Sequence, residues 1–191
     1  MCILKEDLKK QEPSVFASKW IIETIPFLFD NDFDAFLLWK HQLADALVID
    51  AKDIIITGSA CVGYSLNPGK KYKAFQDSSD VDVGVVSEHY FNVAWYDIRN
   101  YPKYKARGKL VNALKEHRDY YIFEGTIAAD KVAPVLSFGP QWNKAISNFR
   151  MGIPINGRDV KFRIYKDNMA FREYQIRGIS KLRDALLGTG E

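Results

Sequence analysis

The chain has 191 residues, of which 47% are hydrophobic, so it is long enough to bury a sizeable core. Its formal charge of +3 permits contact with nucleotides or nucleic acid but does not require it. Two cysteines without disulfide or metal spacing argue against a disulfide scaffold, and the lack of a bilayer-length apolar run argues against a membrane protein, so we expect a soluble, cytoplasmic chain with free thiols.

The first fifty residues have the apolar spacing of helices. We expect a short polar helix over residues 3–10, a second from Pro13 that is disturbed at Pro26, and a third over 32–48. The aromatic side chains of these helices are expected in the core rather than on a base-stacking surface.

A β-branched run over residues 54–57 predicts the first strand, and it breaks at Gly58 and Ser59, which suit a sharp turn. Residues 60–66 then have the pattern of a helix that begins at this turn. The turn is either a phosphate site, made by free amides and the Ser59 hydroxyl, or an ordinary strand-to-helix connection; the acidic strand that follows favours phosphate.

Residues 67–79 open with Asn-Pro-Gly and are otherwise polar, so they predict a loop. Lys70, Lys71 and Lys73 lie in this loop. They either contact a triphosphate or a nucleic-acid backbone, or they are solvated side chains at a loop tip.

The second strand, over residues 80–86, has two faces of opposite character. Side chains alternate along a strand, so Asp80 and Asp82 share one face and the intervening valines share the other. Two neighbouring carboxylates repel each other unless they face water or share a cation such as Mg²⁺. Gly84 continues the acidic face without a side chain and is expected to leave room for a ligand.

The middle of the chain alternates between helical and irregular patterns. We expect a helix over residues 91–98, a basic helix over 103–118, a short strand over 120–123, and irregular chain over 125–140. The basic helix has the densest positive charge in the chain, and it is either a phosphate-backbone contact or a solvated helix face.

The last fifty residues predict a helix, a turn, a strand and a closing helix. The helix covers residues 140–150, and the Asn156-Gly157 dipeptide is a hairpin signal. Residues 159–165 alternate clearly as a strand, and the closing helix runs over 169–187.

The Gly58-Ser59 turn after one strand, followed by Asp80-Val81-Asp82 on a second, resembles the signature of the DNA polymerase β-like nucleotidyltransferase superfamily over residues 53–86. The resemblance implies an α+β fold with a small mixed sheet flanked by helices and with N- and C-terminal helical additions. We therefore expect one domain over 1–191, with N-terminal helices over 1–50, a sheet core with a helical insertion over 53–165, and a C-terminal helix over 168–187.

The resemblance also implies a chemistry. Members that are enzymes use Mg²⁺ to move a nucleoside monophosphate from a triphosphate, here ATP by default, to a hydroxyl of RNA, protein or a small molecule. It assigns Asp80 and Asp82 as catalytic metal ligands, and a nucleotide site to Gly58, Ser59, Lys70 and Lys71.

Such enzymes hold two metal ions with three carboxylates, and the third acid is not evident here. The polar face of the strand over 159–165 offers Lys161 and Arg163, so Asp159 and Asp130 are the remaining candidates for a catalytic role. Three functions stay open: the enzyme, a non-catalytic relative that binds nucleotide or nucleic acid or serves as a partner subunit, and a helical interaction protein with two surface acids.

Overall fold

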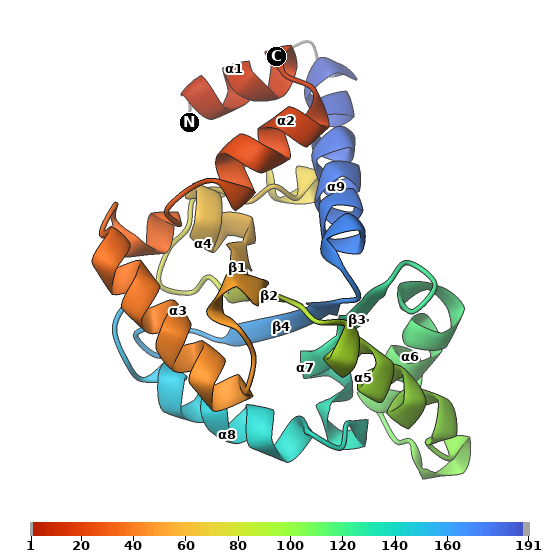
Figure 1. The fold of residues 1–191 in the computed structure, drawn as a ribbon. Helices are drawn as coiled ribbons and strands as arrows, with labels where there is room; N and C mark the ends of the chain where they lie inside the picture. The colour runs from red at the N-terminus through yellow and green to blue at the C-terminus, as the bar shows by residue number, and fades with distance from the viewer. Residues whose placement is uncertain (1, 189–191) are drawn as a thin grey trace.

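The computed structural model describes residues 2–188 and places helices around one mixed sheet (Figure 1). Within these residues the sheet has four strands in the order β1-β2-β4-β3, namely β1 (Ile54–Thr57), β2 (Val81–Val86), β4 (Val160–Tyr165) and β3 (Thr126–Ala128). β1 and β3 run antiparallel to their neighbours, whereas β2 and β4 run parallel. The predicted α+β class with a small mixed sheet is confirmed.

One face of the sheet is aliphatic and packs on helices. Val83 is buried on this face, and Phe162 beside it meets the ring of Trp142 at 5.7 Å between centroids. Trp142 belongs to α8 (Gly139–Arg150), which contacts α3 (Phe33–Leu47), and both helices lie below the sheet in Figure 1. The alternation of β2 therefore places its valines in the core, as the sequence predicts.

The opposite face is covered in part by the long closing helix α9 (Asn168–Gly188). Tyr165 on β4 meets Phe171 and Tyr174 of this helix at 5.0 and 5.6 Å between ring centroids. A Cβ at Gly84 would lie 3.1 Å from the Tyr165 ring and 3.5 Å from that of Phe171. The expectation that Gly84 leaves room for a ligand is wrong, because aromatic rings fill that space.

The N-terminal helices follow the predicted pattern. They are α1 (Cys2–Lys10), α2 (Pro13–Ala17) with a wider π-helical turn (Ser18–Ile22), and α3. Short 3-10 turns lie before α3 at Phe27–Phe29 and after it at Ala51–Asp53. Asp32 caps α3 by accepting a 2.9 Å hydrogen bond from the backbone N–H of Ala35, which satisfies one free amide of the first turn. α1 and α2 pack on α9, so the first and last helices of the described chain lie side by side (Figure 1).

The remaining elements are short and include the largest departures from prediction. They are α4 (Gly58–Val62), a 3-10 turn (Pro68–Lys70), α5 (Glu88–Asn100), a 3-10 turn (Lys103–Lys105), α6 (Lys109–Glu116), a π-helical turn (His117–Tyr121), α7 (Ala129–Val132) and a 3-10 turn (Ala133–Val135). The predicted basic helix is split because Gly108 has a φ of +54°. Residues 120–123 are not a strand, since Ile122 N–H still donates to the His117 carbonyl at 3.1 Å.

Two other regions differ from their predicted form. Residues 125–140 are not irregular, because they contain β3, α7 and the start of α8. Asn156 and Gly157 do turn with positive φ values of 51° and 81°, but they connect α8 to β4 rather than two strands of a hairpin. The hairpin prediction is wrong because β4 pairs with strands that are distant in sequence.

The buried apolar residues form one continuous cluster that includes side chains from α1, all four strands and α9, among the residues described. Cys61 is part of it as a buried free thiol, whereas the Cys2 side chain lies outside the description. Between residues 2 and 188, no helix combines the length and apolar character that crossing a bilayer requires.

Candidate functional site

Asp80 and Asp82, the acidic pair, lie at the side of the sheet where β1 ends and where β2 and β4 begin. Asp82 is in register with Thr57 of β1 on one side and with Lys161 of β4 on the other. Asp80 directly precedes β2 and points to the same side, because its carboxylate contacts the Lys161 ammonium. Residues in register share a face of the sheet, so the two acids and Lys161 form one cluster.

The Gly58-Ser59 turn lies against the acidic pair. Gly58 has a φ of +63°, in the left-handed region, and a Cβ at this position would be only 2.7 Å from Asp82 Oδ2. Glycine is required here for both reasons. The α4 helix that follows ends after five residues, where Gly63 has a φ of 81°, so it contributes only a single turn to the site. The structure thus brings Gly58, Ser59, Asp80 and Asp82 together.

Lys161 supplies a fixed positive charge to the acids. Its side chain is 47% exposed and that of Asp80 is 36% exposed, so water screens their ion pair in part. The hydrogen bond that the Lys161 ammonium donates to the Asp80 carboxylate raises the pKa of Lys161. Burial raises the pKa of Asp82, and the charge of Lys161 opposes this rise. The cluster therefore carries its own cation.

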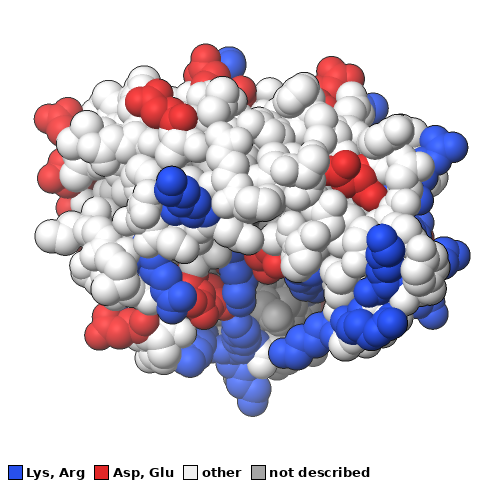
Figure 2. Space-filling view, turned by 90° about the horizontal axis from the view of Figure 1, so that it is seen from below, with Lys and Arg blue, Asp and Glu red and all other residues white. Residues whose placement is uncertain are grey.

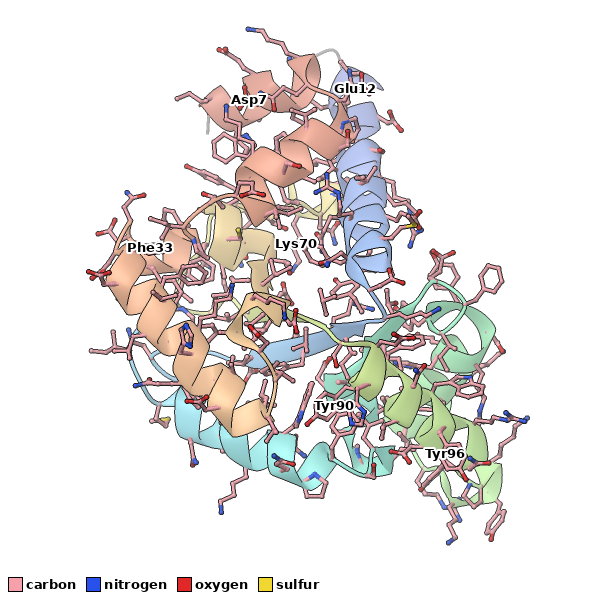
Figure 3. All side chains as sticks on the ribbon, viewed as in Figure 1. Asp7, Glu12, Phe33, Lys70, Tyr90 and Tyr96 are labelled. Carbon is pink, nitrogen blue, oxygen red and sulfur yellow. The ribbon has the colours of Figure 1, made fainter. Side chains whose placement is uncertain are left out.

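A small pocket of about 90 Å³ opens between the turn and the acids. We call it the serine pocket, and its lining residues are Ser59, Ser65, Lys70, Lys73, Ala74, Ser78, Ser79, Asp80 and Asp82. The loop over residues 67–79 reaches this pocket because it runs back along the chain that follows α4, where the Ser65 N–H donates to the Lys73 carbonyl at 2.8 Å. Figure 3 labels Lys70 between α4 and α9. Lys71 does not line the pocket.

A larger pocket of about 250 Å³ lies on the other side of Asp82. We call it the arginine pocket; besides Asp82, its polar lining includes Asp130, Lys131, Lys161, Arg163, Tyr174 and Gln175. The Arg163 guanidinium lies over the rings of Tyr121 and Tyr174, at 5.0 and 4.6 Å from their centroids. Its Nη1 is buried and has no hydrogen-bond partner among residues 2–188. A guanidinium held at the wall of a pocket suits an anionic ligand.

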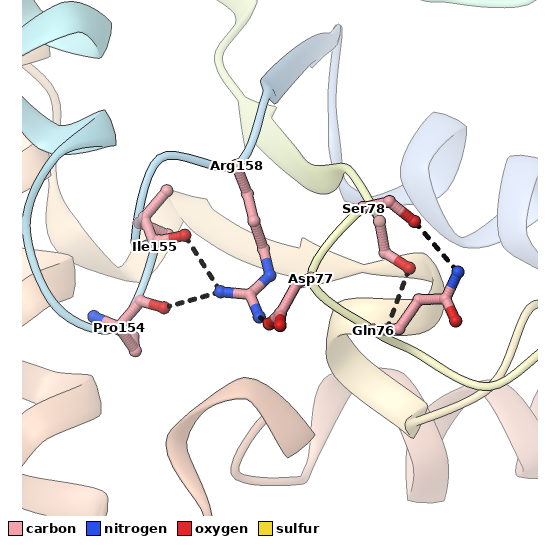
Figure 4. A network of polar contacts seen from close by, with 7 residues as sticks. Gln76, Asp77, Ser78, Pro154, Ile155 and Arg158 are labelled. Atoms are coloured by element: carbon pink, nitrogen blue, oxygen red, sulfur yellow. Dashed lines mark hydrogen bonds and ion pairs between the residues drawn. The ribbon is translucent and has the colours of Figure 1, made fainter.

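The loop before β2 is held by Arg158 (Figure 4). This guanidinium contacts the Asp77 carboxylate at 2.6 Å and donates to the carbonyls of Pro154 and Ile155 at 3.4 and 3.1 Å. Its side chain is 11% exposed, and it also lies over the Phe75 ring. Arg158 therefore connects the loop that carries the serine-pocket residues to the chain that enters β4.

Neither candidate for the third carboxylate completes the acidic pair. Asp159 forms a 2.7 Å ion pair with Arg150 and lines neither pocket. Asp130 does share the arginine pocket with Asp82, together with the basic groups of Lys161 and Arg163. Across residues 2–188, no group of three or more His, Cys, Asp or Glu side chains is arranged to hold a metal ion.

This donor set does not fit a two-ion magnesium centre. Two carboxylates are available, and one of them already binds an ammonium group. Binding of a single Mg²⁺ by Asp80 and Asp82 stays a prediction.

The sequence named Lys73 as a possible triphosphate contact but placed Lys71, not Lys73, in the nucleotide site, and Lys131 and Arg158 were not predicted as parts of the site. Lys161 and Arg163 were treated only as residues that stand where an acid was expected. The alternation of residues 159–165 was a usable signal, because it put Lys161 and Arg163 on one face. Comparisons of this chain with protein-family models, with curated proteins and with solved structures found no match. Any function of the acidic pair and its surroundings must therefore be inferred from their geometry.

Proposed function

We propose that this protein binds the phosphate groups of a nucleotide at the edge formed by β1, β2 and β4, without transferring them. The single observation that carries the proposal is the position of Lys161, which contacts Asp80 and lies in register with Asp82. A lysine ammonium neutralises the acids where a nucleotidyltransferase would need a metal ion. The positive charge of the site therefore favours binding of phosphate, but the site lacks the set of acids that would hold metal ions and activate an attacking hydroxyl.

The local charge supports binding of an anion. Around Asp82, the two pockets are lined by five basic side chains, Lys70, Lys73, Lys131, Lys161 and Arg163, and by three acidic ones, Asp80, Asp82 and Asp130. An excess of positive charge in a concave, partly buried site attracts phosphate. The Ser59 hydroxyl, together with Lys70 and Lys73, offers donors for a phosphate in the serine pocket.

The arginine pocket is the larger of the two and is lined by Tyr174 and Gln175 as well as by charged groups. Arg163 contributes its guanidinium to the wall of this pocket, and its buried Nη1 has no hydrogen-bond partner among residues 2–188. Basic side chains line both pockets, and the two pockets meet at Asp82. Positive charge in each of two adjoining pockets supports a ligand with several phosphates, such as a nucleoside triphosphate, rather than a single inorganic ion.

Equilibrium dialysis with radiolabelled nucleoside triphosphates tests the proposal. We expect binding in EDTA as well as in Mg²⁺, and we expect Lys70→Ala with Lys73→Ala to weaken it by about tenfold or more, since a hydrogen bond to a charged group contributes roughly 1.5–3 kcal/mol. Lys71→Ala is the matched control, because Lys71 is in the same loop but lines neither pocket. Loss of all binding in EDTA, or an equal loss in the control, would contradict the proposal.

A second candidate is Mg²⁺-dependent transfer of a nucleoside monophosphate from ATP or another triphosphate to RNA, a protein or a small molecule. It is favoured by one observation, that Asp130 lies in the same pocket as Asp82. Incubation with labelled triphosphates, Mg²⁺ and cell extract distinguishes the two. A labelled product that disappears with Asp80→Ala and Asp82→Ala would establish transfer and refute a purely binding function.

A further inference from the structure

Residues 99–118 form a strongly basic surface at the end of α5 and along α6. The stretch contains seven basic residues and one acid, so its charge exceeds the +3 of the whole chain. We call it the basic surface, and its charged residues are Arg99, Lys103, Lys105, Arg107, Lys109, Lys115 and Arg118. Lys and Arg side chains gather on the right of the face in Figure 2, the side on which α5 and α6 lie in Figure 1.

The positive charge of the basic surface is not neutralised within the described residues. Its lysines are all exposed, and none of its seven basic side chains forms an ion pair with an acid in residues 2–188. The one acid of the stretch, Glu116, pairs instead with Lys131 of α7 at 3.3 Å. Repulsion among uncompensated lysines is unfavourable for the free protein, so an anionic partner would relieve it.

A groove of about 340 Å³ crosses this surface. Its floor is apolar, from Ala106, Val111 and Leu114, and its basic rim comes from Lys103, Lys115 and Arg118; Asp119 is the one acid in its lining. The Arg118 guanidinium is fixed, because it donates to the carbonyls of Ile98 and Tyr101 at 2.9 and 3.1 Å. An apolar floor between positive rims fits a ligand with flat apolar groups on a charged backbone.

Exposed aromatic rings accompany the lysines. Tyr104 lies between Lys103 and Lys105 in sequence and is 74% exposed, and Tyr96 on α5 is 63% exposed (Figure 3). Ring faces in water beside positive charge are the features on which unpaired bases stack. A duplex would satisfy the lysines but has its bases already paired and stacked, so it would leave the rings unused.

We propose that the basic surface binds single-stranded nucleic acid. The lysines contact backbone phosphates, and bases stack on Tyr104 and enter the groove above Leu114. The proposal does not depend on nucleotide binding at Asp82, because the two sites share no lining residue. RNA and DNA strands share this chemistry, and the experiment tests each of them.

Fluorescence anisotropy with labelled 20-nucleotide RNA and DNA strands, and with the corresponding duplexes, measures the binding over a range of salt concentrations. We expect at least one single strand to bind at least about tenfold more tightly than its duplex. Lys105→Ala with Lys109→Ala and Lys115→Ala should lower the slope of log affinity against log salt by about 2, because each single-strand phosphate contact contributes about 0.7.

Two matched controls separate this surface from general charge and general aromatic exposure. Lys10→Ala with Lys144→Ala and Lys181→Ala removes the same charge from exposed sites elsewhere and should leave the slope unchanged. Tyr104→Ala should weaken binding about tenfold without changing the slope, whereas Phe123→Ala, which removes a ring that is 90% exposed but lies outside residues 99–118, should have no effect. Thermal melting of each variant establishes that it is folded.

Three results would overturn the proposal. Equal affinity for duplex and single strand would mean that the rings play no part. An equal fall in affinity for the two triple-lysine variants would mean that the attraction is non-specific. The third result is displacement of the labelled strand by anionic lipid vesicles or by polyglutamate. If either competitor displaces it at the same concentration of anionic groups as unlabelled strand does, the surface binds a membrane or an acidic protein instead.

Discussion

Replacing Gly58 with alanine tests directly whether the glycine turn and the acids touch. Alanine at the observed φ of +63° costs about 1–2 kcal/mol, the usual penalty for a side chain in the left-handed region. The new Cβ would also lie 2.7 Å from Asp82 Oδ2, so the carboxylate must move, which adds a further cost of about 1–3 kcal/mol. We therefore expect the free energy of unfolding to fall by about 2–5 kcal/mol.

Gly157 provides a control with a positive φ and no close contact. Its φ is +81°, and no described atom lies within 4 Å of a Cβ built there. Gly157→Ala should lose only the backbone term of about 1–2 kcal/mol. Urea unfolding at pH 7, with the same m-value for each protein, compares the two variants.

A double-mutant cycle isolates the contact itself. In an Asp82→Ala background the carboxylate is gone, and the nearest remaining atom of residue 82, its Cβ, is at an ordinary distance of 3.7 Å. Gly58→Ala should then cost no more than Gly157→Ala, which gives a coupling energy of about 1–3 kcal/mol. If Gly58→Ala costs the same as Gly157→Ala, and the cost does not depend on Asp82, the carboxylate does not face the turn and the site geometry is wrong.

Three further predictions concern the supports of the site. Burial lowers the pKa of His117, and its Nε2 accepts a 3.0 Å hydrogen bond from the backbone N–H of Ala128. The neutral imidazole therefore stabilises the fold fully above a pH of about 6.5, and this contribution is lost as the pH falls through the folded-state pKa. Unfolding free energies measured between pH 7 and 5 should fall more steeply in the native protein than in His117→Gln. Arg158→Ala removes hydrogen bonds to two carbonyls and a packed guanidinium, so urea unfolding should show a loss of about 1–3 kcal/mol, and a loss within 0.5 kcal/mol would contradict the loop-anchoring role. Burial raises the pKa of Cys61 to about 12, so a Cys2→Ser protein should not react with a thiol reagent at pH 8 until it is unfolded; rapid reaction in the native state would show that the thiol is accessible.

The elements that the sequence predicted well are those that local pattern determines. The β-branched run of β1 and the alternating valines of β2 indicate two strands and their buried faces from the local sequence alone, whichever strands they pair with. The long helices α3 and α9 were also predicted, because an apolar stripe sustained over several turns indicates a helix that packs on the core. The order of Gly58-Ser59 and the acids then predicted their proximity, which the structure bears out.

The site as a whole could not be predicted, because its composition depends on pairing between distant strands. Lys161 faces Asp82 only because β4 lies parallel to β2 in one register, across a separation of about eighty residues. The short strand β3 has three residues, too few for any periodicity, and this hid the position of Asp130 at the start of α7. Asp159 was a reasonable candidate from its place in the chain, but its side chain turns to Arg150 instead.

Lys161 also yields the sharpest distinction between a metal-dependent site and a metal-independent one. A divalent ion leaves when it is chelated, whereas a lysine on β4 cannot, so nucleotide binding by the native protein should not change between EDTA and Mg²⁺. Lys161→Met keeps the length of the side chain but removes its charge, and Asp80 and Asp82 must then find another cation. We expect this variant to bind triphosphate only when Mg²⁺ is added, as measured by the same dialysis. If both proteins depend on Mg²⁺ to the same extent, Lys161 does not replace the ion, and the acidic pair binds metal as a nucleotidyltransferase would.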